Sequence, residues 1–390
     1  MTKKLLVTGL LLYSSIQILA SQNILSSTQN ELLDLDVQKA SSDVSKLKKD
    51  WIDKNAITYT YAYSKQDNTP ASKLSILSIN QSIFRSGGIY YAIKYASNVN
   101  ENSKLSLEIQ KRNIVTSILT TTYNIKKLDL QILKQNLSLK NAVIDYEKKK
   151  ESVFNGLLDI SFLNNAVLTK NNIKMALIDL EYSKQTLINT LSTLSDLSYD
   201  KIQLPTLKFL SKNNFSKDNL NIKKANIDIK TQKSLSGISN AQYLPKVSVN
   251  YTKTKNHSND NFSNDKYGFN VIIPIDFKTN SAMSSNKLAY LKTKIRKRLI
   301  KQQEEVFFKS NELEIKNISK KIELTEQNIK AYKELLIATK EQYDAGLKTS
   351  NDVEVLSNSK KSEVLSIKIY KIDKQIKLLE LYKRVSNDKI

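Results

Sequence analysis

Hydrophobic residues recur at intervals of three and four along two long stretches, 89–155 and 275–345, that contain neither glycine nor proline. This spacing is typical of a coiled-coil seam. In the second stretch the seam positions are Ile315, Ile318, Ile322, Thr325, Ile329, Tyr332 and Leu336. At a rise of 1.5 Å per residue, a helix over the first stretch would be about 100 Å long. The pattern therefore predicts long helices that pack along most of their length.

The same seam occurs 190 positions earlier, which indicates an internal duplication. The matching positions are Ile125, Leu128, Ile132, Gln135, Leu139, Ala142 and Tyr146. Gly156 and Gly346 share the same offset, and each has an aromatic residue shortly before it. We therefore expect a first repeat over 21–205 and a second over 206–390. Each would contain a helical hairpin that joins a helix of about 65 residues to one of about 45. These hairpins would span about 89–204, with its tip at 156, and about 280–388, with its tip at 346.

Before each long helix the pattern changes to a period of two, which predicts β-strands. We expect strands at about 55–64 and 74–84 in the first repeat and at about 246–253 and 267–277 in the second. These segments largely avoid charge and have about the 9–11 residues that a tilted strand needs to cross a bilayer. An ordinary half-buried sheet remains the alternative. The polar segments Lys65–Lys73 and Thr252–Lys266 have the composition of surface loops, and a shorter helix is expected at about 217–240.

Residues 1–20 have the pattern of a signal peptide, with two lysines, an apolar run and a small residue at the end. An N-terminal membrane anchor is the alternative reading. Farther along, no window of about 18 residues is apolar and free of charge, so no transmembrane helix is expected. If the exported chain enters a membrane, it would do so through its strands.

The composition agrees with long helices and argues against an enzyme. Among 390 residues only 7 are glycine and 4 are proline, whereas average usage would supply roughly 27 and 20. The chain has no cysteine and one histidine, which leaves little for metal binding or imidazole catalysis. We expect no enzymatic activity, no cofactor and no metal. The net charge of +23 suits a polyanion partner, but the lysines are spread along all helices among acids, so we expect no nucleic acid.

Taken in order, these features resemble the TolC-type outer-membrane efflux family, also called outer membrane factors. The resemblance covers nearly the whole chain after the signal peptide. Its local marks are two segments at strand ends and two at hairpin tips: Gln81–Gly87, Tyr243–Val249, Phe154–Ile160 and Tyr343–Val353. Each segment is a weak pattern alone, and their order and spacing make the resemblance specific.

The resemblance implies a mainly α fold with transmembrane β-strands. Three chains would pool their strands into a 12-stranded β-barrel without free edges, standing on an α-helical barrel. This homotrimer would lie in the outer membrane, in contact with its lipid, with the helical part in the periplasm. It would be the passive channel of a tripartite efflux or type I secretion system. Its partners would be a periplasmic adaptor (membrane fusion protein) and an inner-membrane transporter.

The resemblance also suggests three sets of site residues. The tips that would dock the adaptor are Asn155, Gly156, Leu157, Ala345, Gly346 and Leu347. An acidic ring at the channel constriction would use Asp352; the usual second acid of the family is replaced by Val355, while Glu354 lies one position before it. The aromatic residues at the membrane interface would be Trp51, Tyr59, Tyr61, Tyr63, Tyr251, Tyr267 and Phe269.

Two other classes of protein share some of these features. An exported, basic coiled-coil protein with a structural or polyanion-binding role would explain the charge. A periplasmic adaptor subunit would also contain a helical hairpin, but it would need one hairpin and glycine-bearing β-domains. Two hairpins that follow uncharged strand pairs favour the channel.

Overall fold

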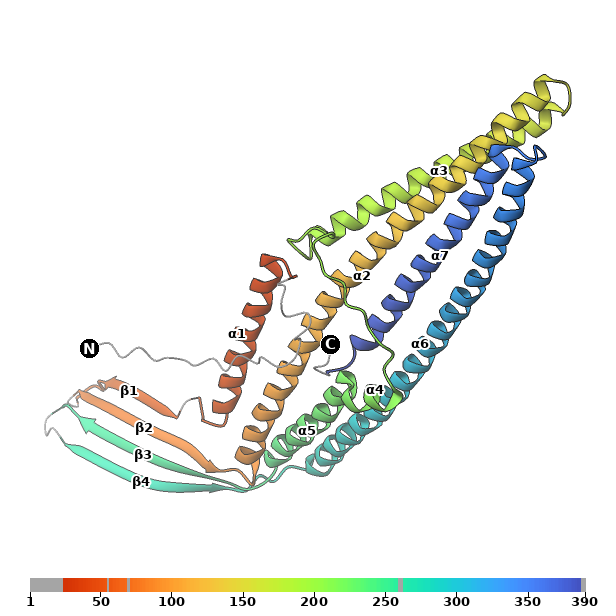
Figure 1. Cartoon of the computed structure of the whole chain (residues 1–390). Helices are drawn as coiled ribbons and strands as arrows, with labels where there is room; N and C mark the ends of the chain where they lie inside the picture. Colours follow the sequence, from red (N-terminus) through yellow and green to blue (C-terminus); the bar gives the residue numbers. More distant parts are fainter. Residues whose placement is uncertain (1–23, 55, 69–70, 259–261, 387–390) are drawn as a thin grey trace, which may run out of the picture. The chain divides into compact units, whose positions relative to one another are not determined.

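The computed structural model describes residues 24–54, 56–68, 71–258 and 262–386, so the expected signal peptide at 1–20 lies outside the described residues. The described chain is mainly helical, with strands in two pairs (Figure 1). The elements are α1 (Ser27–Lys49), β1 (Ile57–Ser64), β2 (Ser72–Phe84), α2 (Gly88–Phe154), α3 (Ile160–Ser192), α4 (Lys212–Asp218), α5 (Leu220–Ala241), β3 (Lys246–Asn256), β4 (Ser263–Ile272), α6 (Thr279–Asp344) and α7 (Ser350–Tyr382).

The chain forms two compact units, each assembled from both halves of the sequence. One unit contains Ile109–Asn219 and Glu304–Ile390, together with the start of α1. It holds both hairpin tips. The other contains Leu33–Glu108 and Leu220–Gln303, and it holds the sheet. Because the halves interleave in this way, the units do not coincide with the sequence repeats.

The return helices of the two hairpins have the same length and the same positions within the repeats. Both α3 and α7 have 33 residues. Their first residues, 160 and 350, differ by 190, and so do their last residues, 192 and 382. The long helices α2 and α6 end at 154 and 344, again 190 apart. The offset seen in the sequence thus recurs in the helix boundaries.

The return helices are shorter than the expected length of about 45 residues. Hydroxyl side chains crowd the end of α3 and bond to its own backbone. The Oγ of Ser192 donates to the carbonyl of Asn189, and Oγ1 of Thr193 donates to the carbonyl of Thr190, each over 2.8 Å. Such bonds compete with the continuation of a helix. The chain after α3 then pairs with the N-terminal segment, where the N–H of Ser26 donates to the carbonyl of Leu194.

The seam positions of both long helices lie on their packed sides. Ile125 and Ala142 of α2 are buried, as are Ile315 and Thr325 of α6, and none of the other seam positions is exposed. The periodicity therefore identified the packing faces correctly.

The helix expected at about 217–240 is present as α5, but it begins three residues later, because a break at Asn219 separates it from the short helix α4. Helix α4 ends at Asp218, and α5 begins at Leu220. Between them Asn219 is extended and fully buried, and it forms an antiparallel bridge with Val385 near the end of the chain. The aromatic ring of Phe215 packs on Phe308 beside this bridge. Tertiary pairing with a distant segment thus interrupts a continuous helical pattern.

The strands form one antiparallel sheet in the order β1-β2-β3-β4. Three strand boundaries differ from the expectation: the end of β3 and both ends of β4. Much of the polar segment Thr252–Lys266 is strand rather than loop, because pairs such as Lys253 with Asp265 continue the β3–β4 ladder. Strand β4 also ends at Ile272 instead of about 277. Pro274 lies two residues later and has no N–H to donate to a ladder.

Candidate functional site

The long helices α2 and α6 end in the same C-terminal capping motif, which depends on a glycine in each hairpin tip. Gly156 has φ +70° and Gly346 has φ +75°, a left-handed backbone that other residues adopt at a cost. The N–H of Gly156 donates to the carbonyl of Val153, and the N–H of Leu157 donates to that of Ser152. In the second tip the N–H of Gly346 donates to the carbonyl of Tyr343, and the N–H of Leu347 donates to that of Gln342. This pair of bonds is the Schellman motif, which ends a helix without leaving its last carbonyls unpaired.

The predicted tip residues are all exposed. They are Asn155, Gly156, Leu157, Ala345, Gly346 and Leu347. Large apolar side chains project there, with exposed fractions of 76% for Phe154, 75% for Leu157 and 76% for Leu347. Exposed apolar groups that gather in one place mark interaction surfaces more often than single ones do. The tips are therefore suitable for contact with another protein.

The helices that follow the tips begin with different caps. In the first hairpin the carboxylate of Asp159 accepts a hydrogen bond from the N–H of Ser161 over 2.8 Å, and bonding to Ser161 lowers the pKa of Asp159. In the second hairpin Thr349 occupies the equivalent position and forms a capping box with Asp352. Such a box satisfies two of the free N–H groups of a helix start.

The structure gives Asp352 a definite local role. Its Oδ2 accepts hydrogen bonds from the N–H of Thr349 over 3.0 Å and from the hydroxyl of Thr349 over 2.9 Å. The Nζ of Lys148 lies 3.6 Å from Oδ1. The backbone and hydroxyl bonds from Thr349, followed by the charge of Lys148, hold the pKa of Asp352 below its usual range. Glu354, two positions later, is exposed. Asp352 thus remains ionised over a wide pH range, as a charged ring would require.

A ladder of polar side chains, which was not predicted from the sequence, joins α2 to α7. Four α2 residues spaced by seven each contact α7. Lys127 pairs with Asp373 over 2.7 Å, Lys134 bonds to Ser366 over 2.8 Å, Asn141 bonds to Asn358 over 2.9 Å, and Lys148 pairs with Asp352 over 3.6 Å. A polar row with a period of seven beside an apolar seam is the sequence signal for such a ladder. These contacts fix the register of one hairpin against the other.

The two faces of the sheet differ sharply in character. Residues paired across antiparallel strands share a face, so the register places six of the predicted interface aromatics together: Tyr59, Tyr61, Tyr63, Tyr251, Tyr267 and Phe269. The same face carries Leu77, Ile79, Val249 and Val271. The opposite face is mainly serine, threonine and asparagine, with Ala62, Leu74, Ile76 and Ile272 as apolar exceptions and Lys246 and Lys266 as charged ones. The sheet is therefore apolar on one side and polar on the other.

The seventh predicted interface aromatic, Trp51, does not belong to this face. It is half-buried in the turn that follows α1, a few residues before β1 begins. The structure thus places Trp51 outside the strands, and its position at the membrane interface stays a prediction.

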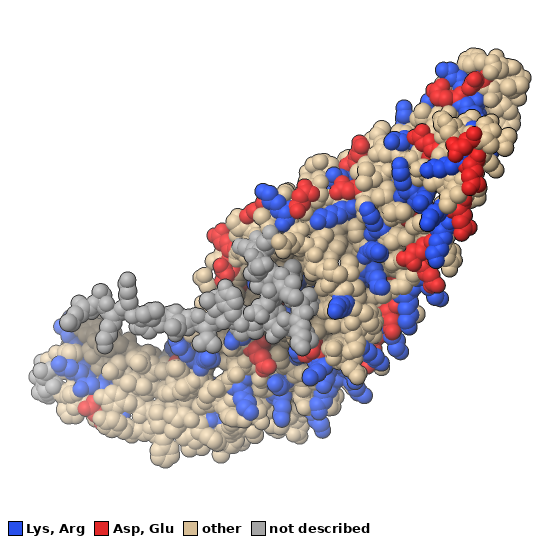
Figure 2. Space-filling model, in the orientation of Figure 1, with Lys and Arg blue, Asp and Glu red and all other residues tan. Residues whose placement is uncertain are grey.

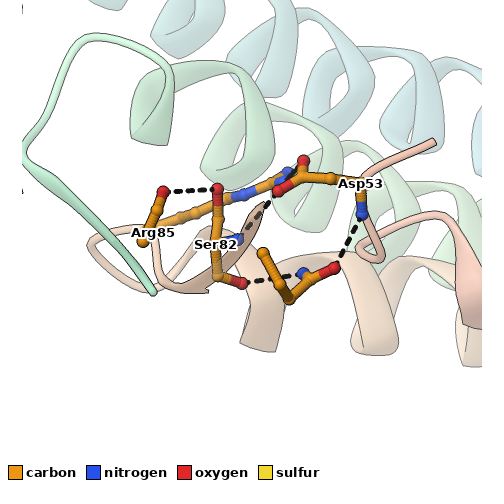
Figure 3. A network of polar contacts seen from close by, with 5 residues as sticks. Asp53, Ser82 and Arg85 are labelled. Carbon is orange, nitrogen blue, oxygen red and sulfur yellow. Dashed lines mark hydrogen bonds and ion pairs between the residues drawn. The ribbon is translucent and has the colours of Figure 1, made fainter. Parts of the chain in front are cut away.

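A polar network fixes the helix-proximal end of the sheet (Figure 3). Asp53 forms an ion pair with Arg85, and its Oδ2 accepts a hydrogen bond from the N–H of Ser82 over 2.8 Å. The hydroxyl of Ser82 lies 3.2 Å from that of Ser248 on β3. Partial burial alone would raise the pKa of Asp53, but the bonds from Ser82 and the charge of Arg85 outweigh it and lower this pKa. The network ties both strand pairs to the turn after α1.

Among the residues that the structure describes, there is no group of three or more histidine, cysteine, aspartate and glutamate side chains that could hold a metal ion. Over the same described ranges, no helix has the length and apolar character needed to cross a membrane.

Comparison with solved structures identifies the fold. No family model matches the sequence, and a search of curated proteins finds no match either. The structure, however, is similar to the outer membrane protein VceC of Vibrio cholerae, with a TM-score of 0.72 and 16% identity over 93% of this chain and 94% of that one.

Two further outer membrane channels show the same similarity. The Campylobacter jejuni channel CmeC matches with a TM-score of 0.72 and 13% identity, over 92% of this chain and 83% of that one. The open state of the Neisseria gonorrhoeae channel MtrE matches with a TM-score of 0.69 and 14% identity, over 91% of this chain and 86% of that one. CmeC and MtrE are outer membrane channels. The chain therefore has the fold of outer-membrane channels, as the resemblance to the TolC-type family implied.

Proposed function

We propose that this protein is an outer-membrane efflux channel that works as a homotrimer. It would be the passive exit duct of a tripartite efflux or type I secretion system. The observation that carries the proposal is the two-faced sheet, which is aromatic and apolar on one side and polar on the other, in a chain with the fold of outer-membrane channels. Transmembrane strands alternate in this way between a lipid-facing and a lumen-facing side.

The edges of the sheet support the trimer. Strands β1 and β4 are the outer members of the four-stranded sheet. Open strand edges are not tolerated in the hydrocarbon region of a bilayer, because their N–H and C=O groups find no partner there. Pairing of β1 in one copy with β4 in the next would satisfy both edges. Three copies would then close a 12-stranded barrel.

Exposed apolar side chains on the helices support the same assembly. One row on α3 consists of Leu168, Met175, Ile178 and Tyr182, at helical spacing. Another group on α6 consists of Val306, Leu313, Leu324 and Leu335. Neighbouring copies would bury these groups in the wall of an α-helical barrel. The helical part would lie in the periplasm.

The tips and the capping acid would then carry the functional contacts. The exposed apolar tips around Gly156 and Gly346 are suited to a periplasmic adaptor, which would connect the channel to an inner-membrane transporter. Asp352, with Glu354 close by, would form an acidic ring at the constriction, because threefold symmetry repeats each carboxylate around one axis. A periplasmic adaptor role for the chain itself is disfavoured by its two hairpins and its single two-faced sheet.

Electrophysiology tests the proposal directly. The mature protein would be purified from membranes in detergent, run with and without heating on a gel, and added to a planar lipid bilayer. We expect a heat-sensitive trimer and discrete conductance steps. A protein that purifies as a soluble periplasmic monomer and forms no channels would contradict the proposal.

A further inference from the structure

Three lysines lie on the apolar face of the sheet, beyond its tyrosines and next to the strand loops. Lys253 and Lys255 follow Tyr251 on β3 at alternate positions, and the register places them opposite Leu77 and Ser75 of β2. Lys73 is opposite Tyr63 of β1. These cross-strand pairs put all three lysines on the same face as the strand aromatics.

The three lysines are close enough to bind one anionic group. Alternate residues of a strand are about 7 Å apart, which is the separation of Lys253 from Lys255. Lys73 is diagonal to Lys255 across the β2–β3 pair, at about 7–8 Å. All three are exposed, and none of them forms an ion pair within the part of the chain that the structure describes. Their ammonium groups can therefore converge on a shared partner.

Polar groups between the lysines add hydrogen-bonding capacity. The hydroxyl of Ser75 accepts a hydrogen bond from Tyr59 over 3.0 Å and lies 2.9 Å from Nε2 of His257. The nearby carboxylate of Asp265 is opposite Lys253, but it accepts a hydrogen bond from the hydroxyl of Tyr251 over 2.9 Å. We call Lys73, Ser75, Lys253, Lys255 and His257 the lysine patch. The net charge of the lysine patch is positive, because it contains three lysines and no acidic residue.

The order of side chains along the strands matches the order of groups in a lipid. Next to the patch the face becomes apolar, with Leu77, Ile79, Tyr267 and Phe269. In Figure 2 the visible side of the sheet is largely uncharged, and blue side chains lie near its loop end. Lysine binds phosphate as a compact point charge, and its long stem lies easily along apolar surface. A polyanion without acyl chains would leave the adjoining apolar band without a partner.

We propose that the lysine patch binds the phosphate of an anionic membrane lipid whose acyl chains lie against the adjoining aromatic face. This inference rests on the proposed channel function, since it requires the apolar face of the sheet to contact a bilayer. The bound lipid would be in the leaflet nearer the strand loops.

Native mass spectrometry of the full mature oligomer in detergent tests the proposal. Phosphatidylglycerol and phosphatidylcholine would be titrated separately into the wild type and into the K73Q/K253Q/K255Q variant. The matched control is K65Q/K246Q/K266Q, which removes the same charge. Lys246 and Lys266 lie on the opposite face of the sheet, and Lys65 follows β1. We expect the wild type and the control to prefer phosphatidylglycerol by about tenfold, and the patch variant to lose that preference.

Several outcomes would overturn the proposal. One is a wild type that binds both lipids equally, or a patch variant that keeps the preference. Another is an equal loss in both variants, which would indicate general charge rather than a local site. Binding of inorganic phosphate alone, without preference for phosphatidylglycerol, would also reject a lipid site. Oligomer mass and bilayer conductance of the same samples separate this result from the channel proposal, because a conducting oligomer without lipid preference contradicts the lipid site alone.

Discussion

Asn358 of α7 donates a hydrogen bond from Nδ2 to Oδ1 of Asn141 of α2 over 2.9 Å, and it is only 3% exposed. The amide of Asn141 in turn donates to the carbonyl of Val355 over 3.4 Å. A buried polar pair between packed helices fixes their register, because a shifted register would leave both amides without partners. The pair occupies the third step of the ladder between the two hairpins.

Replacement of Asn141 by leucine would leave the buried amide of Asn358 without its acceptor. We expect a loss of about 1–3 kcal/mol of stability. The double variant N141L/N358L would recover most of the loss, because an apolar pair of similar size needs no partner. Thermal unfolding followed by circular dichroism, arranged as a double-mutant cycle, measures the coupling. Additive effects of the two changes would show that the amides do not act as a pair.

Glycine is required at position 346 because of its backbone conformation, and not because a side chain would lack room there. A Cβ at this position would meet no atom within 4 Å, but φ is +75°. Gly346→Ala would therefore cost about 1–2 kcal/mol of local stability. Gly346→Asn would cost less, because asparagine tolerates the left-handed region. Hydrogen exchange of the tip peptides reports the difference, and equal protection in both variants would contradict a conformational cause.

The capping box of α7 makes a pH-dependent contribution to stability. The pKa of Asp352 in the folded protein is below its ordinary value of 3.8. Its contribution is therefore present above that ordinary value and disappears as the pH falls through the lower pKa of the folded state. We expect Asp352→Ala to lower the melting temperature at pH 7 and to have little effect at about pH 2. A difference that persists unchanged at acidic pH would exclude ionisation as its source.

The same carboxylate would influence ion selectivity if it lines the constriction. Asp352→Asn should weaken the cation preference of the channel and its block by polyvalent cations, because three negative charges are lost from the ring. Lys148→Gln should have the opposite effect, since it removes the cation that lies 3.6 Å from Asp352. Reversal potentials in asymmetric salt measure both. Unchanged selectivity and block in Asp352→Asn would reject the acid as a gate residue.

Adjacent residues of β4 offer a test of which face meets lipid. Phe269 is on the aromatic face, and Asn270 is on the polar one. Phe269→Arg should reduce the folded oligomer in membranes, because arginine on the lipid face costs about 2–4 kcal/mol near the bilayer midplane. Asn270→Arg should be tolerated and should instead alter conductance. The amount of heat-sensitive oligomer distinguishes them, and equal yields would argue against the assignment of faces.

The sequence by itself determined which helices and strands are repeated and which glycines form the turns at the hairpin tips. Long runs without glycine or proline, with seams at three and four, identified α2 and α6, because a helix shows its packing face in its own periodicity. Gly156 and Gly346 were recognised as tips, since a positive φ after a long helix is a local requirement. Alternation identified the strands and grouped their tyrosines, because the period of two is also local.

Only the tertiary structure decided how distant segments meet. The break at Asn219 depends on its bridge to Val385, and the polar β3–β4 ladder depends on pairing across the hairpin. The polar ladder from Lys127 to Lys148 forms only because α7 lies beside α2 and supplies the partner side chains. Likewise, Lys73 and Lys255 become one patch only through the β2–β3 register. Local patterns record what each residue requires of its neighbours in the chain, whereas partners far apart in sequence are selected by packing and by the need to pair buried polar groups.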